Sequence, residues 1–446
     1  MQVSPFDSAI YASLLSDQEA ASLLSDHAQV SAMLQVEGAL ALAQGEVGLI
    51  PAESAKSIAE AANSLTLAPL DLAKGTASAG VPVPALVAAL KAALPKEHAR
   101  WVHFGATSQD IVDSALVLNL RPLLHLFKTR MVKLIDSLAS IAKEHGQTLI
   151  AGRTRTQQAV PMSFGYKAAL WFSPFLRHLE RLEQGEPRWL KTQLSGAVGT
   201  LAAMGDKAPD VADAFARELS LNNDGNWHTQ RDSLVELSGW LANTTGSLGK
   251  LGQDWLWLSQ TEVGEIRFTN GGGSSTMPQK CNPVDAEAMV ALARLSASLV
   301  GQMHQAMQHE HERSGSQWTQ EWFVLPQQLM ALASALSHAQ EAIDHIVINQ
   351  EKMLANLGCY NGVIYAEAAT FALAEHMTRD EASAIVKPAC QTAIHGDEHL
   401  FNLIEKQTGI ALSVDQMRDS LVSAGATHTE LTRLLAAASA CVNAAQ

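Results

Sequence analysis

The sequence predicts an all-α protein organised around a bundle of long helices. Its prolines are clustered, so that residues 284–325 and 327–387 contain none, and a helix without internal proline can continue for many turns. Between Arg231 and Glu262 the apolar residues recur at steps of three and four over about four heptads, a spacing typical of helices packed in a bundle. No run of useful length alternates between apolar and polar residues, so we predict no extended β-sheet.

The helical patterns are unevenly distributed along the chain and indicate three domains. Residues 1–107 are predicted to form short helices because prolines interrupt them at positions 51, 69, 82, 84 and 95. From Ser108 onward the patterns are much longer, and after Gly358 they are short again. We therefore predict an N-terminal helical domain over 1–107, a central long-helix domain over 108–356 and a small C-terminal helical domain over 357–446.

The clearest long helix, within 231–262, carries a continuous apolar stripe. The stripe comprises Leu234, Leu237, Leu241, Thr244, Leu248, Leu251, Trp255 and Leu258. Glycines at 239, 246, 249 and 252 each weaken such a helix by about 1 kcal/mol, so we expect them where helices approach closely. Apolar series at 292–303 and 329–346 indicate two further long helices.

The expected helix lengths bear on the oligomeric state. A helix of about 30 residues spans about 45 Å, which is long for a compact monomer of this size. A bundle core shared between subunits is the economical interpretation, and a single elongated bundle is the alternative.

Composition and charge exclude several classes of function. The 446 residues, 47% apolar and 17% charged, are typical of a soluble globular protein with a large core. The net charge of −14 argues against nucleic acid or an anionic membrane as partner. Four cysteines without metal-ligand spacing are expected to be reduced thiols in the cytoplasm. We predict no membrane span, no export signal and no metal site.

Residues 271–283 read GGGSSTMPQKCNP and concentrate hydrogen-bond donors in one short loop. Its glycines permit positive φ and close approach of the backbone to a ligand, and its serine, lysine and asparagine side chains supply donors. This is the chemistry of a loop that holds an anion. The alternative is an ordinary glycine-rich loop that ends in a helix cap at Asn282 and Pro283. A P-loop is excluded by the order of its residues.

Four other polar stretches lie where loops are expected to meet helices. Residues 103–110 read HFGATSQD, which predicts a helix start capped by Thr107 or Ser108, and such a start also offers N–H groups to an anion. Residues 152–161 read GRTRTQQAVP. Residues 227–232 read WHTQRD. The arginine of this stretch is suited to binding a carboxylate, and the alternative is that it pairs with a nearby group of the protein. Residues 309–318 read HEHERSGSQW, for which a solvated helix end is favoured over zinc binding.

As strings, these stretches resemble the signature regions of the fumarase/aspartase superfamily. The resemblance lies in His-x-Gly-x-Thr-Ser-x-Asp, Gly-Arg-Thr and Ser-Ser-x-Met-Pro-x-Lys-x-Asn. Residues 227–232 and 310–322 are similar to the muconate cycloisomerase branch, which acts in bacterial protocatechuate breakdown. The resemblance covers nearly the whole chain. It implies a three-domain all-α homotetramer with a central helix bundle, active sites assembled from three subunits and no cofactor.

The resemblance also assigns roles to residues of this chain. It implies that Ser274 donates the proton to the substrate carbon, and that Lys280 and Asn282 hold the developing negative charge. The residues expected to bind a small tricarboxylate are His103, Thr107, Ser108, Arg153, Thr154, Arg155, Gln158, His228, Thr229, Gln230, Arg231, Ser275, Met277 and Arg313. The four arginines of this set are candidates for binding the three carboxylates in an otherwise acidic protein.

One departure from the superfamily pattern changes the expected chemistry. Arg155 stands where the lyases carry a histidine that protonates the leaving group. A cycloisomerase needs no such acid, because its nucleophile is a carboxylate of the substrate itself, already ionised at pH 7. Two alternatives stay open: a fumarate-producing lyase similar to adenylosuccinate lyase, and a non-catalytic structural homologue like the lens crystallins related to argininosuccinate lyase.

Overall fold

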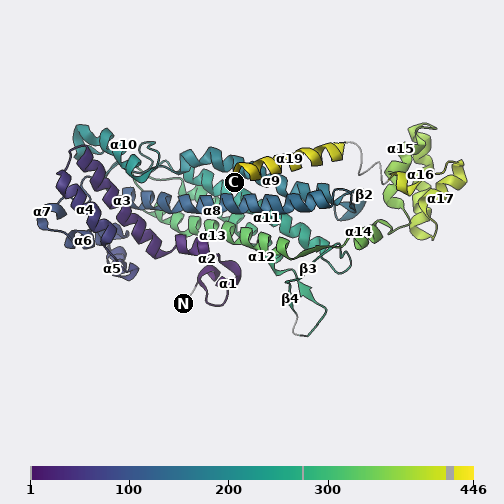
Figure 1. Ribbon diagram of the computed structural model, residues 1–446, viewed down its shortest axis with the longest axis horizontal. Coiled ribbons are helices and arrows are strands. Elements are labelled where there is room, and N and C mark those ends of the chain that lie inside the picture. The colour runs from purple at the N-terminus through teal and green to yellow at the C-terminus, as the bar shows by residue number, and fades with distance from the viewer. Residues whose placement is uncertain (1–2, 274–275, 418–425, 446) are drawn as a thin grey trace. The chain divides into compact units, whose positions relative to one another are not determined.

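The computed structural model describes residues 3–273, 276–417 and 426–445, and most of this chain is helical (Figure 1). The prediction of an all-α fold with long helices is confirmed. The long helices are α8 (Ser108–Glu144), α9 (Phe164–Trp189), α11 (Asp232–Leu258), α12 (Val284–Ala306) and α13 (Ser316–Asp344).

The helix boundaries agree with the sequence at most positions. Helix α8 begins at Ser108, and α11 covers the predicted stripe. Helix α13 is longer than expected at its start because it continues through Pro326, while Ile346 belongs to a strand instead of this helix. A proline removes one helical hydrogen bond, and packing along a 29-residue helix offsets that loss.

The chain divides into two compact units. Unit 1 comprises Met1–Thr129, His178–Gly246 and Ala291–Ser337, and unit 2 comprises Arg130–Arg177, Ser247–Val290 and His338–Gln446. Each of the five long helices contributes residues to both units. The three sequence domains over 1–107, 108–356 and 357–446 stay a prediction.

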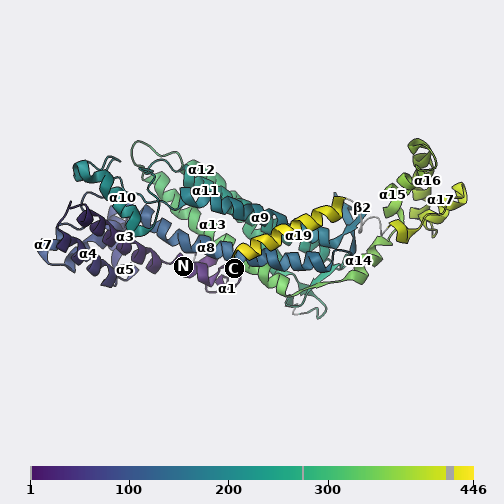
Figure 2. The ribbon, with the colours of Figure 1, turned by 45° about the horizontal axis from the view of Figure 1, so that its top comes forward.

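In unit 1 the N-terminal helices pack around an apolar core. Helices α3 (Asp26–Glu46), α4 (Ala52–Ser64) and α10 (Ala208–Leu219) lie together (Figure 2). A second cluster in this unit joins the bundle helices through Val117, Leu234, Leu299 and Val324. The short helices of unit 1 are α1 (Ala12–Leu15), α2 (Gln18–Leu23), α5 (Pro69–Ala79), α6 (Val83–Ala92) and α7 (Lys96–Ala99).

Unit 2 contains three antiparallel strand pairs that the sequence did not predict. They are β1 (Leu149–Thr154) with β2 (Gln157–Ser163), β3 (Ile266–Phe268) with β6 (Ile346–Ile348), and β4 (Gly272–Gly273) with β5 (Cys281–Asn282). The expectation of no useful strand was wrong for the β1–β2 hairpin, whose turn lacks the Asn-Gly or Asp-Gly signal of such turns. The remaining helices of unit 2 are α14 (Gln350–Leu357), α15 (Ala366–Leu373), α16 (Arg379–His395), α17 (Leu400–Thr408) and α19 (Ala426–Ala445).

The glycines of α11 differ in their surroundings. A Cβ at Gly252 would lie 2.8 Å from the carbonyl oxygen of Ala286, so glycine permits the close approach of α12 there. Gly239 and Gly246 face open space in this chain. Of Gly239, Gly246 and Gly252, the predicted close approach is therefore confirmed at Gly252. None of the helices in the described residues has both the length and the apolar composition that a membrane span requires.

Candidate active site

A buried ion cluster surrounds Arg231, the residue before α11. Arg231 donates from Nε and Nη2 to Glu321 at 2.8 and 2.6 Å, and from Nη1 and Nη2 to Asp113 at 2.7 and 3.1 Å. Nη1 also donates to the carbonyl oxygen of Trp227 at 3.3 Å. These contacts use all five guanidinium N–H groups. Local pairing, the alternative considered for Arg231, is what the structure shows, and it leaves no donor for a substrate.

The electrostatics of this cluster favour the ionised forms of Arg231 and Glu321. Burial by itself lowers the pKa of Arg231, but the charges of Asp113 and Glu321 outweigh burial and raise that pKa. Burial raises the pKa of Glu321, and the charge and hydrogen bonds of Arg231 lower it overall. The indole of Trp318 donates a further hydrogen bond to Asp113 at 3.1 Å. One buried cation is thus held between two buried carboxylates that come from α8 and α13.

A third buried carboxylate, Asp110, ties three segments together. It accepts hydrogen bonds from the backbone N–H groups of Thr107 at 2.9 Å, Ser195 at 2.9 Å and Gly196 at 3.0 Å. His228 Nε2 lies 2.8 Å from Asp110 Oδ1, and both side chains are fully buried. Of the capping arrangement expected at the start of α8, the contact from Thr107 N–H to Asp110 is present, and Asp110 fixes His228 at the same time. Within the described residues, His228 Nδ1 is buried and has no hydrogen-bond partner.

Five of the expected substrate-binding residues surround these buried clusters at positions that solvent reaches. Thr107 and Ser108 are partly exposed where α8 begins, Thr229 is partly exposed, and Gln230 is exposed. Arg313, in the connection between α12 and α13, is exposed and donates from Nη1 to the hydroxyl of Thr107. Buried carboxylates therefore position a polar surface of unit 1 that carries an accessible guanidinium.

In unit 2 the β1–β2 hairpin presents two arginines in different ways. Arg153 makes a bidentate pair with Glu265, with both N···O distances 2.8 Å, and the Glu265 side chain is fully buried. Arg155 is exposed in the two-residue turn, with φ of 50°, followed by Thr156 with φ of 69°. Left-handed backbone at two consecutive non-glycine residues is uncommon. The turn thus holds Arg155 out into solvent at a cost in backbone strain.

Two more expected binding residues lie on the same hairpin. Thr154 is exposed at the end of β1. Gln158 is partly exposed and donates from Nε2 to the carbonyl oxygen of Asn356 at 3.1 Å. Asn356 in turn donates to Glu265 at 2.8 Å. Gln158 and Arg153 therefore anchor the hairpin to two different partners, Asn356 and Glu265, which are hydrogen-bonded to each other.

The signature loop joins β4 to β5 in unit 2. Ser274 and Ser275, expected as proton donor and binding residue, lie outside the described residues. Met277 and Lys280 are exposed, and Asn282 is partly exposed in β5, where it pairs with Gly272. Gly272 and Gly273 do not use the positive φ that glycine permits, because they form the extended strand β4.

Glycine is needed at the neighbouring position for close contact. A Cβ on Gly271 would lie 2.3 Å from Cys281 Sγ, a distance at which the two strands of the loop base would have to separate. Cys281 Sγ lies 3.2 Å from the carbonyl oxygen of Phe268. The glycine therefore lets the two ends of the loop meet closely, which leaves residues 276–280 exposed between them.

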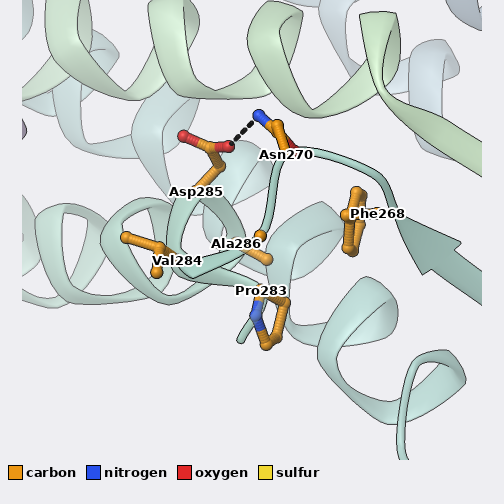
Figure 3. Close-up of a pocket in the computed structure, with 7 residues that line it drawn as sticks. Phe268, Asn270, Pro283, Val284, Asp285 and Ala286 are labelled. Atoms are coloured by element: carbon orange, nitrogen blue, oxygen red, sulfur yellow. Dashed lines mark hydrogen bonds between the residues drawn. The ribbon is translucent and has the colours of Figure 1, made fainter. Parts of the chain in front are cut away.

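The base of the signature loop is tied to α12 and α13. Asp285 accepts hydrogen bonds from Asn270 Nδ2 at 3.1 Å, as Figure 3 shows, and lies 2.7 Å from His338 Nδ1. A pocket beside these contacts encloses no space for even a water molecule, whereas ligand sites typically offer roughly 300–1,000 Å³. It belongs to the loop base and is too small for the substrate. Its lining residues are Phe268, Asn270, Gly271, Pro283, Val284, Asp285 and Ala286.

Sequence reasoning missed three buried acids that position the expected residues. Asp113 holds Arg231, Glu265 holds Arg153, and Glu37 contacts His103. Glu37 and Asp113 are each a single acid within an apolar helical run, and a buried charge requires a partner. That pattern is the signal that would have found them. Among the described residues, no three His, Cys, Asp or Glu side chains form a group able to hold a metal ion.

Comparison with known proteins assigns the family. Residues 12–295 match a sequence family described as lyase. The 3-carboxy-cis,cis-muconate cycloisomerase of Pseudomonas aeruginosa is 40% identical over 89% of this chain and 88% of that protein, and the enzyme of the same name from Acinetobacter baylyi is 38% identical over 90% of each. The crystal structure of 3-carboxy-cis,cis-muconate lactonizing enzyme from Pseudomonas putida superposes with a TM-score of 0.91, at 35% identity, over 97% of this chain and 100% of that one. The chain therefore belongs to the lyase family that includes the 3-carboxy-cis,cis-muconate cycloisomerases.

Proposed function

We propose that this protein converts 3-carboxy-cis,cis-muconate to 4-carboxymuconolactone, a step of the protocatechuate branch of the β-ketoadipate pathway. The observation that carries the proposal is the match to cycloisomerases over about nine-tenths of the chain. Arg155 supports it from the residues themselves, because an arginine at this position cannot protonate an amine or alkoxide leaving group at neutral pH.

The reaction needs little acid–base help at its start. A carboxylate oxygen of the substrate adds to the conjugated diene and forms the lactone C–O bond, and the electron pair moves into an aci-carboxylate at the far end. The carbon next to that group then takes up a proton. We assign the proton to Ser274 and charge stabilisation to Lys280 and Asn282. One such hydrogen-bond donor typically contributes about 2.7–4 kcal/mol to transition-state stabilisation.

Four arginines were candidates to bind the three substrate carboxylates, and their contacts separate them. Arg231 and Arg153 have carboxylate partners inside the protein. Arg155 and Arg313 are exposed, and we assign substrate binding to these two. Arg231 and Arg153 have structural roles. Arg231 fixes the segment before α11, and Arg153 fixes the hairpin that presents Arg155.

We also propose that the active enzyme is a cytoplasmic homotetramer with active sites shared between subunits. Gly239, Gly246 and Gly301 face open space in the single chain, and Phe323 on α13 is exposed. Small residues and an exposed aromatic side chain on bundle helices suit packing against further copies. Light scattering on the purified protein tests this assembly, and a monomer would contradict the shared site.

The activity is tested by the ultraviolet absorbance of the conjugated diene. Purified protein is mixed with 3-carboxy-cis,cis-muconate, and the same assay is run with adenylosuccinate and with the Ser274→Ala variant. Rapid loss of diene absorbance with the muconate alone, and only in the protein with intact Ser274, is the expected result. Cleavage of adenylosuccinate without loss of the muconate would assign the chain to the fumarate-producing lyases. Inactivity on both substrates in a folded tetramer would overturn the proposal and favour a structural role.

A further inference from the structure

His103 and Glu37 form a close hydrogen-bonded pair that the proposed reaction does not yet use. His103 Nδ1 lies 2.6 Å from Glu37 Oε1. The Glu37 side chain on α3 is only 1% exposed, whereas the His103 side chain is 19% exposed. Across the described residues, Glu37 Oε2 is buried without a hydrogen-bond partner. The carboxylate thus has His103 as its hydrogen-bonding partner, and the histidine itself reaches the surface.

The backbone around His103 is held in place by the same helix. His103 has φ of 63°, a left-handed conformation that costs a non-glycine residue free energy and persists only where neighbours enforce it. Gln44, two turns after Glu37 on α3, donates from Nε2 to the carbonyl oxygen of Phe104 at 2.7 Å. Helix α3 therefore fixes both the ring of His103 and the backbone that follows it.

The charges near His103 favour its protonated form. Burial lowers the pKa of His103, but the charge and hydrogen bond of Glu37 and the charge of Asp110 outweigh burial and raise the pKa above its usual 6.5. Lys91 acts in the opposite direction and is the weakest of these influences. With Nδ1–H donated to Glu37, the second proton lies on Nε2. Among the described residues, no group hydrogen-bonds to this nitrogen.

We propose that Glu37 is a positioning residue that keeps His103 as an imidazolium, so that Nε2–H donates a charged hydrogen bond to a carboxylate of the substrate. This inference rests on the proposed tricarboxylate substrate. It adds a second cation to the exposed Arg313. Because His103 lies in the loop that leads into Thr107, this cation belongs to the same polar surface of unit 1 as Arg313.

The test uses Glu37→Gln, which keeps the shape and the hydrogen-bond acceptor for Nδ1–H but removes the charge. The matched control is Glu53→Gln, which removes an exposed carboxylate of α4. The pKa of His103 is measured in the full-length protein from the pH dependence of its C2-hydrogen exchange, followed by mass spectrometry. We expect a pKa above 6.5 in the natural protein and in the control, and a clear fall in Glu37→Gln. An unchanged pKa would overturn the proposal.

Steady-state kinetics supply the second readout. For Glu37→Gln we expect the KM for 3-carboxy-cis,cis-muconate to rise about tenfold at pH 7.5, the effect of one charged hydrogen bond, and to return toward the natural value below pH 6, where the ring is protonated without Glu37. A merely structural defect would raise KM equally at all pH values and would contradict the proposal. If Glu37→Gln does not fold, His103→Asn, which tolerates left-handed backbone, should show a raised KM that no longer recovers at low pH.

The two readouts separate this inference from the proposed function. If the protein does not consume the muconate, the proposed function fails, while the exchange experiment still decides whether Glu37 sets the charge of His103. If the protein consumes the muconate but the KM of Glu37→Gln matches that of Glu53→Gln at every pH, only the inference about His103 fails.

Discussion

The two units of the chain use arginine in contrasting ways. In unit 1, Arg231 is fully buried, stacks on Trp227 with its guanidinium carbon 4.6 Å from the ring centre, and has every N–H group engaged. In unit 2, Arg155 lies in an exposed hairpin turn. Both residues come from polar signature stretches and are equally plausible ligands for an anion in the sequence. Burial and partners, and not residue type, separate an arginine that orders the protein from one that is available to a substrate.

The largest effect is expected in the signature loop, away from any buried cluster. Ser274→Ala should lower kcat by about 10²–10⁴-fold, the range for loss of acid–base help, without changing the thermal midpoint. Gln279→Ala is the control, because it alters an exposed residue of the same loop. Near-normal turnover by a folded Ser274→Ala protein would remove this serine from the mechanism.

The structural role of the buried Arg231 in unit 1 is tested by Arg231→Met. This change leaves Asp113 and Glu321 buried without their cation, and removal of one partner from a buried pair typically costs about 3–5 kcal/mol. Urea unfolding should show the loss as a lower midpoint. Arg217→Gln breaks an exposed pair with Glu46 and should cost less than about 1 kcal/mol. Equal costs for the two variants would contradict the structural role of Arg231.

The role of the exposed Arg155 in unit 2 is tested by Arg155→Asn. Asparagine tolerates the left-handed backbone of the turn but carries no charge. We expect KM for the muconate to rise about tenfold, as for loss of one charged hydrogen bond, with unfolding by urea unchanged. Thr156→Asn changes the other turn residue and serves as the control. A KM that stays at the natural value would show that Arg155 does not bind the substrate.

The smallest effect concerns stability and pH at the Glu37–His103 pair. A histidine whose folded-state pKa is raised contributes stability below its unfolded pKa of about 6.5, and this contribution is lost as pH rises through the folded-state value. The stability difference between the natural protein and Glu37→Gln should therefore be largest at pH 5.5 and shrink by pH 9 in urea unfolding. A difference that does not vary with pH would argue that the ring does not change charge in this range.

Much of the fold was determined by the sequence alone. Apolar residues recur every three or four positions, and proline and glycine are unevenly distributed along the chain. Both are local properties of the sequence, so they were sufficient to predict α11 and the start of α8. The β1–β2 hairpin was not predictable in the same way, because its turn is formed by Arg155 and Thr156, whose preferences oppose the backbone that they adopt.

Only the tertiary structure decided which polar residues are available. Arg231 is 118 residues from Asp113 and 90 from Glu321 in the chain, and Arg153 is 112 residues from Glu265. The local sequence does not reveal such distant partners, because they come into contact only when segments far apart in the chain pack together. The sequence thus determined the helices and the residue types of the polar stretches. The packing decided that Arg231 and Arg153 pair with internal carboxylates, while Arg155 and Arg313 are exposed.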